Sequence, residues 1–320
     1  MSGALPRIAV MGAGALGCFF GGRLAQAGAQ VTLIGRAAAV EAIKRDGLTL
    51  ESAGTAAKVR VDATVDPNGA RGAKLVLMCV KSGDTARAAE ALAPHLDADA
   101  VLVSLQNGVG NVERIHAATG RRVIAGLVYI GTNMPAPAHV RHSGGDRIVL
   151  GAVKGCGAEE LLVGETAATF RKAGINADVS ADIEAGLWHK LMLNCAYNAV
   201  CALTGKPYGE MGAVPEVRAI MREAAQEVIA LARHKGATIP ADVFDGLFTM
   251  TQSMPQQMSS TAQDIAKGRA TEIDYLNGYV ARESEKLGIA APVNRSLNAL
   301  VKLRERHGDD VSTQGRGGKT

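Results

Sequence analysis

The sequence predicts an α/β protein with a doubly wound sheet in residues 1–182 and a second, all-helical domain in residues 183–307. Short apolar runs alternate with helical segments up to about residue 180, and a glycine-rich turn follows the first run. Such alternation is typical of parallel strands joined by helices. Strand-like runs vanish after Asp182. The expected strands are residues 7–11, 30–35, 74–80, 101–105 and 123–129, and residues 131–151 are expected to add antiparallel strands.

The first strand leads into a turn with Gly-x-Gly-x-x-Gly spacing. The first glycine allows the tight turn, the second lets the backbone approach a pyrophosphate, and the third lets the next helix pack closely on the strand. The amino end of that helix then offers free N–H groups and a positive dipole to phosphates. We therefore predict a Rossmann-type dinucleotide site. Its expected cofactor-binding residues are Gly12, Ala13, Gly14, Ala15, Leu16 and Gly17.

The second strand ends at Arg36, nineteen positions after Gly17. NAD-binding domains usually carry Asp or Glu at this place, where the carboxylate binds the ribose hydroxyls. An arginine can bind a 2′-phosphate instead, so the sequence predicts NADPH as the cofactor. The alternative is a solvated arginine at a strand end.

Polar residues follow the next two strands. Lys81 comes after residues 74–80, and Asn107 comes after residues 101–105. Ligand groups project from the carboxyl ends of parallel strands, so both residues are candidates for the site. The alternatives are a surface lysine and an Asn-Gly turn formed with Gly108.

Composition excludes several classes of function. The net charge of +4 comes without a basic run longer than two residues, and aromatic residues make up 3% of the chain, which argues against nucleic acid as a partner. The five scattered cysteines indicate reduced thiols in a cytoplasmic protein, with no disulfide framework and no metal site. No apolar stretch reaches membrane-spanning length, and the first strand begins too early for a signal peptide.

The second half is expected to consist of helices. Clear helical patterns cover residues 183–203, 217–235 and 271–287, the last ending before Gly288 as a carboxyl cap. Apolar helices of this kind are suited to a homodimer contact, although the sequence does not determine the oligomeric state. The polar, glycine-rich segment 308–320 is expected to be a disordered tail.

One of these helices carries a polar stripe. Residues 183–203 are apolar on nearly all sides, yet Lys190, Asn194 and Asn198 recur at every fourth position and share one face. Leaving such groups buried and unpaired costs roughly 1–3 kcal/mol each, so we favour a cleft wall over bonds to neighbouring backbone. In ketone reduction, hydride comes from a nicotinamide and a protonated amine supplies the proton to the developing alkoxide.

Two blocks in the helical half are the most specific motif of the chain. Residues 259–264 read SSTAQD and residues 271–278 read TEIDYLNG. Together with the glycine turn, Arg36, Lys81, Asn107 and the Lys190 helix, they make the chain resemble the ketopantoate reductases (2-dehydropantoate 2-reductases) from about residue 7 to about residue 305. These are NADPH enzymes of pantothenate synthesis. The resemblance implies reduction of ketopantoate to (R)-pantoate.

The resemblance also implies roles for individual residues. Lys190 would be the proton donor, and Glu272 would pair with it and touch the cofactor's ribose. Glu272 on its own also fits a simple acidic residue at a helix amino end. The implied substrate contacts are Asn107, Lys190, Asn194, Asn198 and Ser260. The implied cofactor contacts beyond the glycine turn are Arg36, Lys81, Asn107, Thr132 and Glu272.

The chain departs from the family pattern at two places on the substrate side. Tyr208, in the segment Lys-Pro-Tyr-Gly, stands where many members have an amide, and Thr261 stands where methionine is common. These changes keep open a paralogous NADPH-dependent reductase of another small 2-oxo acid. A separate alternative is a non-catalytic protein that senses dinucleotides.

Overall fold

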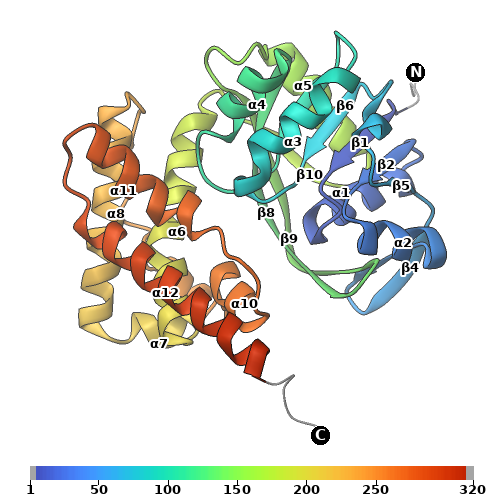
Figure 1. Ribbon diagram of the computed structural model, residues 1–320. Helices are drawn as coiled ribbons and strands as arrows, with labels where there is room; N and C mark the ends of the chain where they lie inside the picture. Colours follow the sequence, from blue (N-terminus) through green and yellow to red (C-terminus); the bar gives the residue numbers. More distant parts are fainter. Residues whose placement is uncertain (1–4, 315–320) are drawn as a thin grey trace, which may run out of the picture. The chain divides into compact units, whose positions relative to one another are not determined.

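The computed structural model describes residues 5–314, and for residues 307–314 it describes the backbone alone. The chain forms two compact units with the boundary between Ile183 and Glu184, one residue from the expected position (Figure 1). The first unit contains the sheet, and the described part of the second unit contains helices and no strand. The predicted fold class is confirmed.

The sheet of the first unit has ten strands in the order β4-β3-β9-β8-β7-β6-β1-β2-β5, with β10 beside β9. The strands from β5 through β1 to β8 are parallel, and the strand order reverses between β1 and β6. Ligands of doubly wound sheets bind at the carboxyl ends of the strands at such a reversal. The strands are β1 (Ile8–Met11), β2 (Val31–Ile34), β3 (Leu48–Ser52), β4 (Thr55–Val59), β5 (Asp62–Thr64), β6 (Leu75–Met78), β7 (Val101–Ser104), β8 (Arg122–Ala136), β9 (His139–Ala152) and β10 (Asn176–Val179).

Antiparallel pairing occurs where the sequence predicted it. β8 is parallel to β7 over its first residues and then continues as a long ribbon paired with antiparallel β9. The predicted strand 123–129 is therefore only the first half of β8. The β3–β4 hairpin, which lies at one edge of the sheet, was not predicted, because its strands are short and its outer strand is almost entirely exposed.

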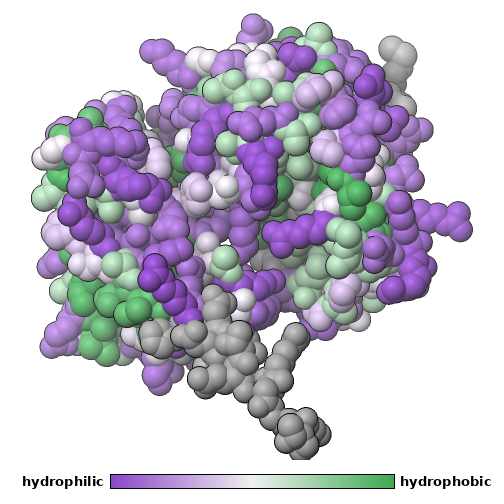
Figure 2. Space-filling model, viewed as in Figure 1, coloured by the Kyte–Doolittle hydropathy of each residue, from purple (hydrophilic) through white to green (hydrophobic). Residues whose placement is uncertain are grey.

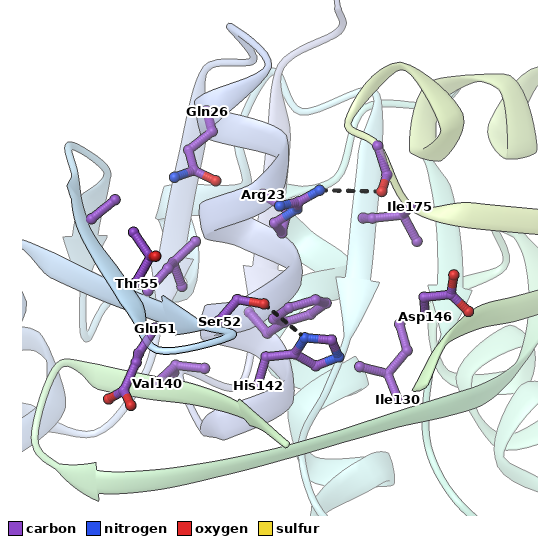
Figure 3. A pocket seen from close by; sticks show the side chains of 14 residues that line it. Arg23, Gln26, Glu51, Ser52, Thr55, Ile130, Val140, His142, Asp146 and Ile175 are labelled. Atoms are coloured by element: carbon purple, nitrogen blue, oxygen red, sulfur yellow. Dashed lines mark hydrogen bonds between the residues drawn. The ribbon is translucent and has the colours of Figure 1, made fainter. Parts of the chain in front are cut away.

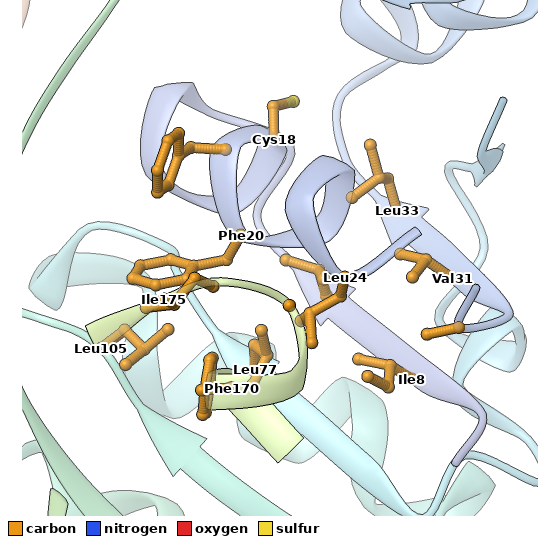
Figure 4. Packing of buried hydrophobic residues seen from close by; sticks show 14 of the residues in the cluster. Ile8, Cys18, Phe20, Leu24, Val31, Leu33, Leu77, Leu105, Phe170 and Ile175 are labelled. Carbon is orange, nitrogen blue, oxygen red and sulfur yellow. The ribbon is translucent and has the colours of Figure 1, made fainter. Parts of the chain in front are cut away.

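Helices join the parallel strands, and α1 occupies the centre of the core. Phe20 and Leu24 of α1 are fully buried against the sheet, and Phe20 meets Phe170 edge-on with ring centroids 5.7 Å apart (Figure 4). Burying a side chain of this size contributes roughly 1.5–3 kcal/mol, so the core holds α1 firmly against the sheet. The helices are α1 (Ala15–Gln26), α2 (Ala37–Asp46), α3 (Thr85–Leu92), α4 (Asn111–Thr119) and α5 (Glu160–Lys172), with single 3₁₀ turns at Pro67–Ala70, Ser82–Asp84 and Ala93–His95.

The second unit is built around α6, whose residues 195–202 are all buried. Its helices are α6 (Ile183–Thr204), α7 (Tyr208–Gly212), α8 (Pro215–His234), α9 (Thr249–Ser253), α10 (Ser260–Ala266), α11 (Asn277–Lys286) and α12 (Pro292–Gln314), with a 3₁₀ turn η4 (Ile273–Tyr275). Helix α12 continues through seven residues of the segment expected to be a disordered tail. Residues 315–320 of that segment lie outside the described residues.

Buried amides connect the helices around α6. The side chain of Asn277 donates one hydrogen bond to the carbonyl oxygen of Cys195 (3.0 Å) and one to the side chain of Asn294 (2.9 Å). Asn294 in turn donates to the carboxylate of Glu227 on α8 (2.7 Å). Because buried polar groups are stable only when paired, this chain of bonds fixes α8, α11 and α12 on α6.

The helix predicted over residues 271–287 is interrupted, so that expectation was wrong. The turn η4 ends at Tyr275, the backbone of Leu276 is not helical, and α11 begins only at Asn277. The buried bonds of Asn277 outweigh the local preference for a continuous helix. The predicted carboxyl cap is confirmed, because Gly288, two residues after the last residue of α11, adopts a positive φ of 68°.

The face drawn in Figure 2 is largely hydrophilic, with apolar side chains in small groups. Within the described residues, no helix combines the length and the apolar character needed to cross a membrane. The same residues contain no cluster of three or more His, Cys, Asp or Glu side chains suited to a metal ion. The five cysteines are free thiols.

Candidate active site

The glycine turn between β1 and α1 has a separate structural reason for each glycine. Gly12 has a φ of +114°, and a Cβ added there would lie 2.7 Å from the backbone of Cys79 and Val80. A Cβ on Gly17 would lie 2.0 Å from the carbonyl oxygen of Gly12. A Cβ on Gly14 would meet nothing within 4 Å. The outer two glycines are therefore required by packing, whereas the middle one leaves the backbone open to a ligand.

The N–H groups of this turn divide into two sets. Those of Gly12 and Ala13 both donate to the carbonyl oxygen of Ile34, at 2.9 Å and 3.2 Å, so they hold the turn onto β2. The first hydrogen bond within α1 runs from Cys18 to Gly14. The amides before Cys18 in the first turn have no partner within the helix and suit a phosphate. These amides belong to Ala15, Leu16 and Gly17.

Arg36 lies two residues after the end of β2 and is the amino-terminal cap residue of α2. Its side chain is 91% exposed, and its Nη2 atom lies 3.9 Å from the Oδ2 atom of Asp84. Asp84 also forms an ion pair with Arg87. The sequence analysis did not identify Asp84, although its place three residues after Lys81, near a strand end, was an available signal.

The ends of β6 and β7 are tied together around Asn107. Its carbonyl oxygen accepts hydrogen bonds from the side chains of Ser82 and Asn111, each at 2.9 Å. Gln106 donates to the carbonyl oxygen of Val80 at 2.9 Å. The side chain of Asn107 makes no hydrogen bond to any described residue, so its amide remains available for a ligand.

Lys81 and Thr132 are two further candidates in the first unit. Lys81 is half-buried and begins the 3₁₀ turn that follows β6. Thr132 is half-buried on β8, opposite His142 of β9 and beyond a register shift. It lies seven residues past Ala125, which pairs with the end of β7, so it is about 20 Å further along the strand. The roles of both residues stay predictions.

In the second unit, the polar stripe lies on α6 as the spacing predicted. Lys190 and Asn194 are half-buried, and Asn198 is buried. Burial lowers the pKa of the Lys190 amine from 10.5 to about 8, and the negative charge of Glu272 opposes this shift. The amine thus lies within the electrostatic influence of the Glu272 carboxylate, and their pairing at the site stays a prediction.

The serine block lies against the carboxyl-terminal half of α6. The Ser259 side chain accepts a hydrogen bond from the N–H of Ala262 (3.1 Å) and donates one to the carbonyl oxygen of Asn198 (3.3 Å). Ser259 is buried, whereas Ser260, the first residue of α10, is exposed. Ser259 therefore anchors α10, which leaves the hydroxyl of Ser260 accessible.

Tyr208, one of the departures from the family pattern, is buried in the second unit. Its ring packs edge-on against Tyr197 with centroids 4.8 Å apart, and the hydroxyl of Tyr197 donates to the carbonyl oxygen of Leu247 at 2.7 Å. These contacts indicate that Tyr208 packs in the interior of the second unit.

A pocket of about 310 Å³ lies in the first unit. It is formed by α1, the β3–β4 hairpin and the ribbon of β8 and β9, and Ser52 and His142 share a hydrogen bond of 3.1 Å within it (Figure 3). None of the predicted cofactor or substrate residues lines this pocket.

Comparisons with known proteins identify the family of the chain. The family model of the ketopantoate reductase PanE/ApbA matches residues 8–155, and that of the ketopantoate reductase PanE/ApbA C terminal matches residues 182–305. The 2-dehydropantoate 2-reductase of Halobacterium salinarum is 33% identical over 308 residues, covering 94% of this chain and 100% of that protein.

Solved structures show the same fold. A PanE/ApbA family ketopantoate reductase from Ralstonia eutropha JMP134 superposes with a TM-score of 0.88 at 43% identity, covering 95% of this chain and 99% of that chain. A D-mandelate dehydrogenase, solved with NADH and anilino(oxo)acetate, has a TM-score of 0.85 at 23% identity over 95% of this chain and 99% of its own, a likeness that shows the fold alone. From the family models and these relatives, the chain belongs to the ketopantoate reductase family of oxidoreductases.

Proposed function

We propose that the protein catalyses the NADPH-dependent reduction of 2-dehydropantoate to (R)-pantoate, with Lys190 as the proton donor. The observation that carries this proposal is the Lys190 amine, which is half-buried on a polar stripe and coupled to Glu272. Family membership supports the reaction type. A bound nicotinamide dinucleotide supplies hydride to the keto carbon.

The glycine turn fits such a dinucleotide. Gly14 leaves its backbone open, and the first-turn amides of α1 face no competing acceptor within the helix. Arg36, almost fully exposed just after β2, would bind the 2′-phosphate through charge-assisted hydrogen bonds. The amide of Asn107 would contact the ligand from the end of β7.

Lys190 is suited to donate the proton. A lysine with a pKa of about 8 is mostly protonated at neutral pH and yet gives up its proton more readily than an ordinary lysine. Its positive charge stabilises negative charge that develops on the carbonyl oxygen. Glu272 keeps the amine charged before the reaction, because its negative charge raises the pKa of the amine.

The substrate's polar groups would be held by the residues near Lys190 in the same unit. Asn194 lies one turn along α6, and Asn198 lies one turn further. Ser260 would bind the carboxylate, since Ser259 fixes its backbone beside the Asn198 turn. A 2-oxo acid with a hydroxyl group offers partners to all of them.

A second candidate is reduction of a different 2-oxo acid by a paralogue. The likeness of fold to D-mandelate dehydrogenase shows that this architecture is found with an aromatic 2-oxo acid analogue, anilino(oxo)acetate, bound. Spectrophotometric rates of NADPH oxidation with ketopantoate, 3-methyl-2-oxobutanoate and phenylglyoxylate separate the two. We expect kcat/KM to be at least about 100-fold higher for ketopantoate, because its hydroxyl pairs with polar groups that the analogues leave unpaired. A higher value for either analogue would favour the paralogue, and no NADPH oxidation with any keto acid would favour a dinucleotide sensor.

The pH dependence of turnover tests the state of Lys190. Donation needs the protonated amine, so kcat/KM is expected to fall about tenfold per pH unit once the pH exceeds the lysine pKa of about 8. The Lys190→Arg variant provides the control, because arginine stays protonated over the whole range and should retain a weak activity without this alkaline decline. A decline of the same shape in both proteins would assign it to another group.

A further inference from the structure

The surroundings of Arg36 contain a negative charge that the proposed cofactor preference does not explain. Asp84 ends the 3₁₀ turn Ser82–Asp84 after β6, and Arg36 follows β2. Both strands neighbour β1, one on each side, so their carboxyl ends flank the glycine turn. Nη2 of Arg36 lies 3.9 Å from Oδ2 of Asp84. A group bound by Arg36 therefore also meets a carboxylate.

Asp84 is held more firmly than Arg36. Its N–H donates to the carbonyl oxygen of Lys81 at 2.8 Å, and its Oδ1 atom pairs with Arg87 in the first turn of α3. The Asp84 side chain is 31% exposed, against 91% for Arg36. The carboxylate of Asp84 is therefore held beside Arg36 by contacts of its own.

We propose that Asp84 is a cofactor-specificity residue that weakens the binding of NADPH relative to NADH. This inference rests on the proposed function, in which Arg36 binds the 2′-phosphate. The carboxylate repels that phosphate, which carries close to two negative charges. NADH has an uncharged hydroxyl at the same position and escapes the repulsion. Asp84 thereby reduces the preference for NADPH over NADH that Arg36 creates, so that the enzyme accepts both cofactors.

The distances set the size of the effect. With Arg36 in the observed position, a phosphate oxygen bonded to its Nη2 atom at about 2.8 Å would lie within about 7 Å of Oδ2 of Asp84. At this separation in a solvent-exposed setting, the repulsion corresponds to about a three- to tenfold change in affinity. Because the carboxylate and the phosphate are both accessible to solvent, salt should reduce the repulsion between them.

The test is to titrate the full-length protein with each nucleotide, in the absence of a keto acid, and to measure binding by the fluorescence of the cofactor. The Asp84→Asn variant is expected to bind NADPH about fivefold more tightly and NADH within twofold of the wild type. The gain should shrink in about 0.5 M salt. Glu90→Gln is the matched control. It removes one negative charge from an exposed position on α3, the helix that follows Asp84, and should change neither the NADPH affinity nor the NADH affinity. Asp84→Ser is a second variant in case the asparagine protein folds poorly.

The outcomes separate this inference from the proposed function. An unchanged ratio of NADPH to NADH affinity in both Asp84 variants would overturn it. Weaker NADPH binding in them would also overturn it, because Asp84 would then orient Arg36 for the phosphate. If Arg36→Ala weakens both nucleotides equally, the assignment of Arg36 to the 2′-phosphate fails instead, whatever the Asp84 variants do.

Discussion

Replacing Lys190 by alanine is expected to lower kcat by a factor of about 100 to 10,000, the usual contribution of a positioned general acid. The alanine protein loses both the proton donor and the positive charge next to the developing alkoxide. Its affinity for NADPH should stay within about twofold, because the glycine turn and Arg36 belong to the first unit and Lys190 to the second. Stopped-flow hydride transfer and a separate NADPH titration measure the two quantities.

His189 offers a matched control for this experiment. It is the neighbouring half-buried residue on α6 and lies off the polar stripe. His189→Ala should therefore keep kcat within about threefold of the wild type, while both variants retain the wild-type circular dichroism spectrum. A Lys190→Ala protein that turns over ketopantoate at the normal rate would remove this amine from the mechanism.

Replacing Arg36 by alanine is expected to weaken NADPH binding by about 10- to 100-fold and to leave NADH binding within about threefold. A charge-assisted hydrogen bond contributes about 1.5–3 kcal/mol, and only NADPH presents the phosphate that would accept it. Arg36 is almost fully exposed and packs against little, so the substitution should not disturb the fold. Titration of each nucleotide, monitored by fluorescence, gives both affinities.

Arg45 is the corresponding control, since it is an exposed arginine in the last turn of α2, the helix that Arg36 caps. Arg45→Ala should leave both affinities near the wild-type values. If Arg45→Ala weakens NADPH as much as Arg36→Ala does, the effect reflects overall charge, and the specific contact with the 2′-phosphate is excluded.

Local patterns predicted most of the fold because their causes are local. The strand, glycine turn and helix at the start of the chain follow from sterics within a few residues: Gly17 must be glycine because Gly12 is near it in the chain. The stripe on α6 follows from helical spacing alone, and the structure places Lys190, Asn194 and Asn198 on that helix. The roles of these residues remain predictions.

Local patterns failed where distant contacts decide the conformation. The helix expected over residues 271–287 breaks before Asn277, because the side chain of that asparagine is buried in bonds to α6 and α12. The difference between Ser259 and Ser260 was likewise invisible in the sequence. Contacts with Asn198, 61 residues earlier in the chain, and with Cys201, 58 residues earlier, anchor Ser259, whereas Ser260 is exposed.

The sequence by itself determined the α/β class, the dinucleotide turn, the polar face of α6 and the family. Each of these depends on which residue types occur a few positions apart in the chain. The tertiary structure alone decided which charges face one another. It brought Glu272 into the electrostatic field of Lys190 and Asp84 to the side of Arg36. Such pairings form only when the fold brings together residues that are far apart in the chain. The electrostatic energy of each pair then depends on the distance between the charges and on their burial.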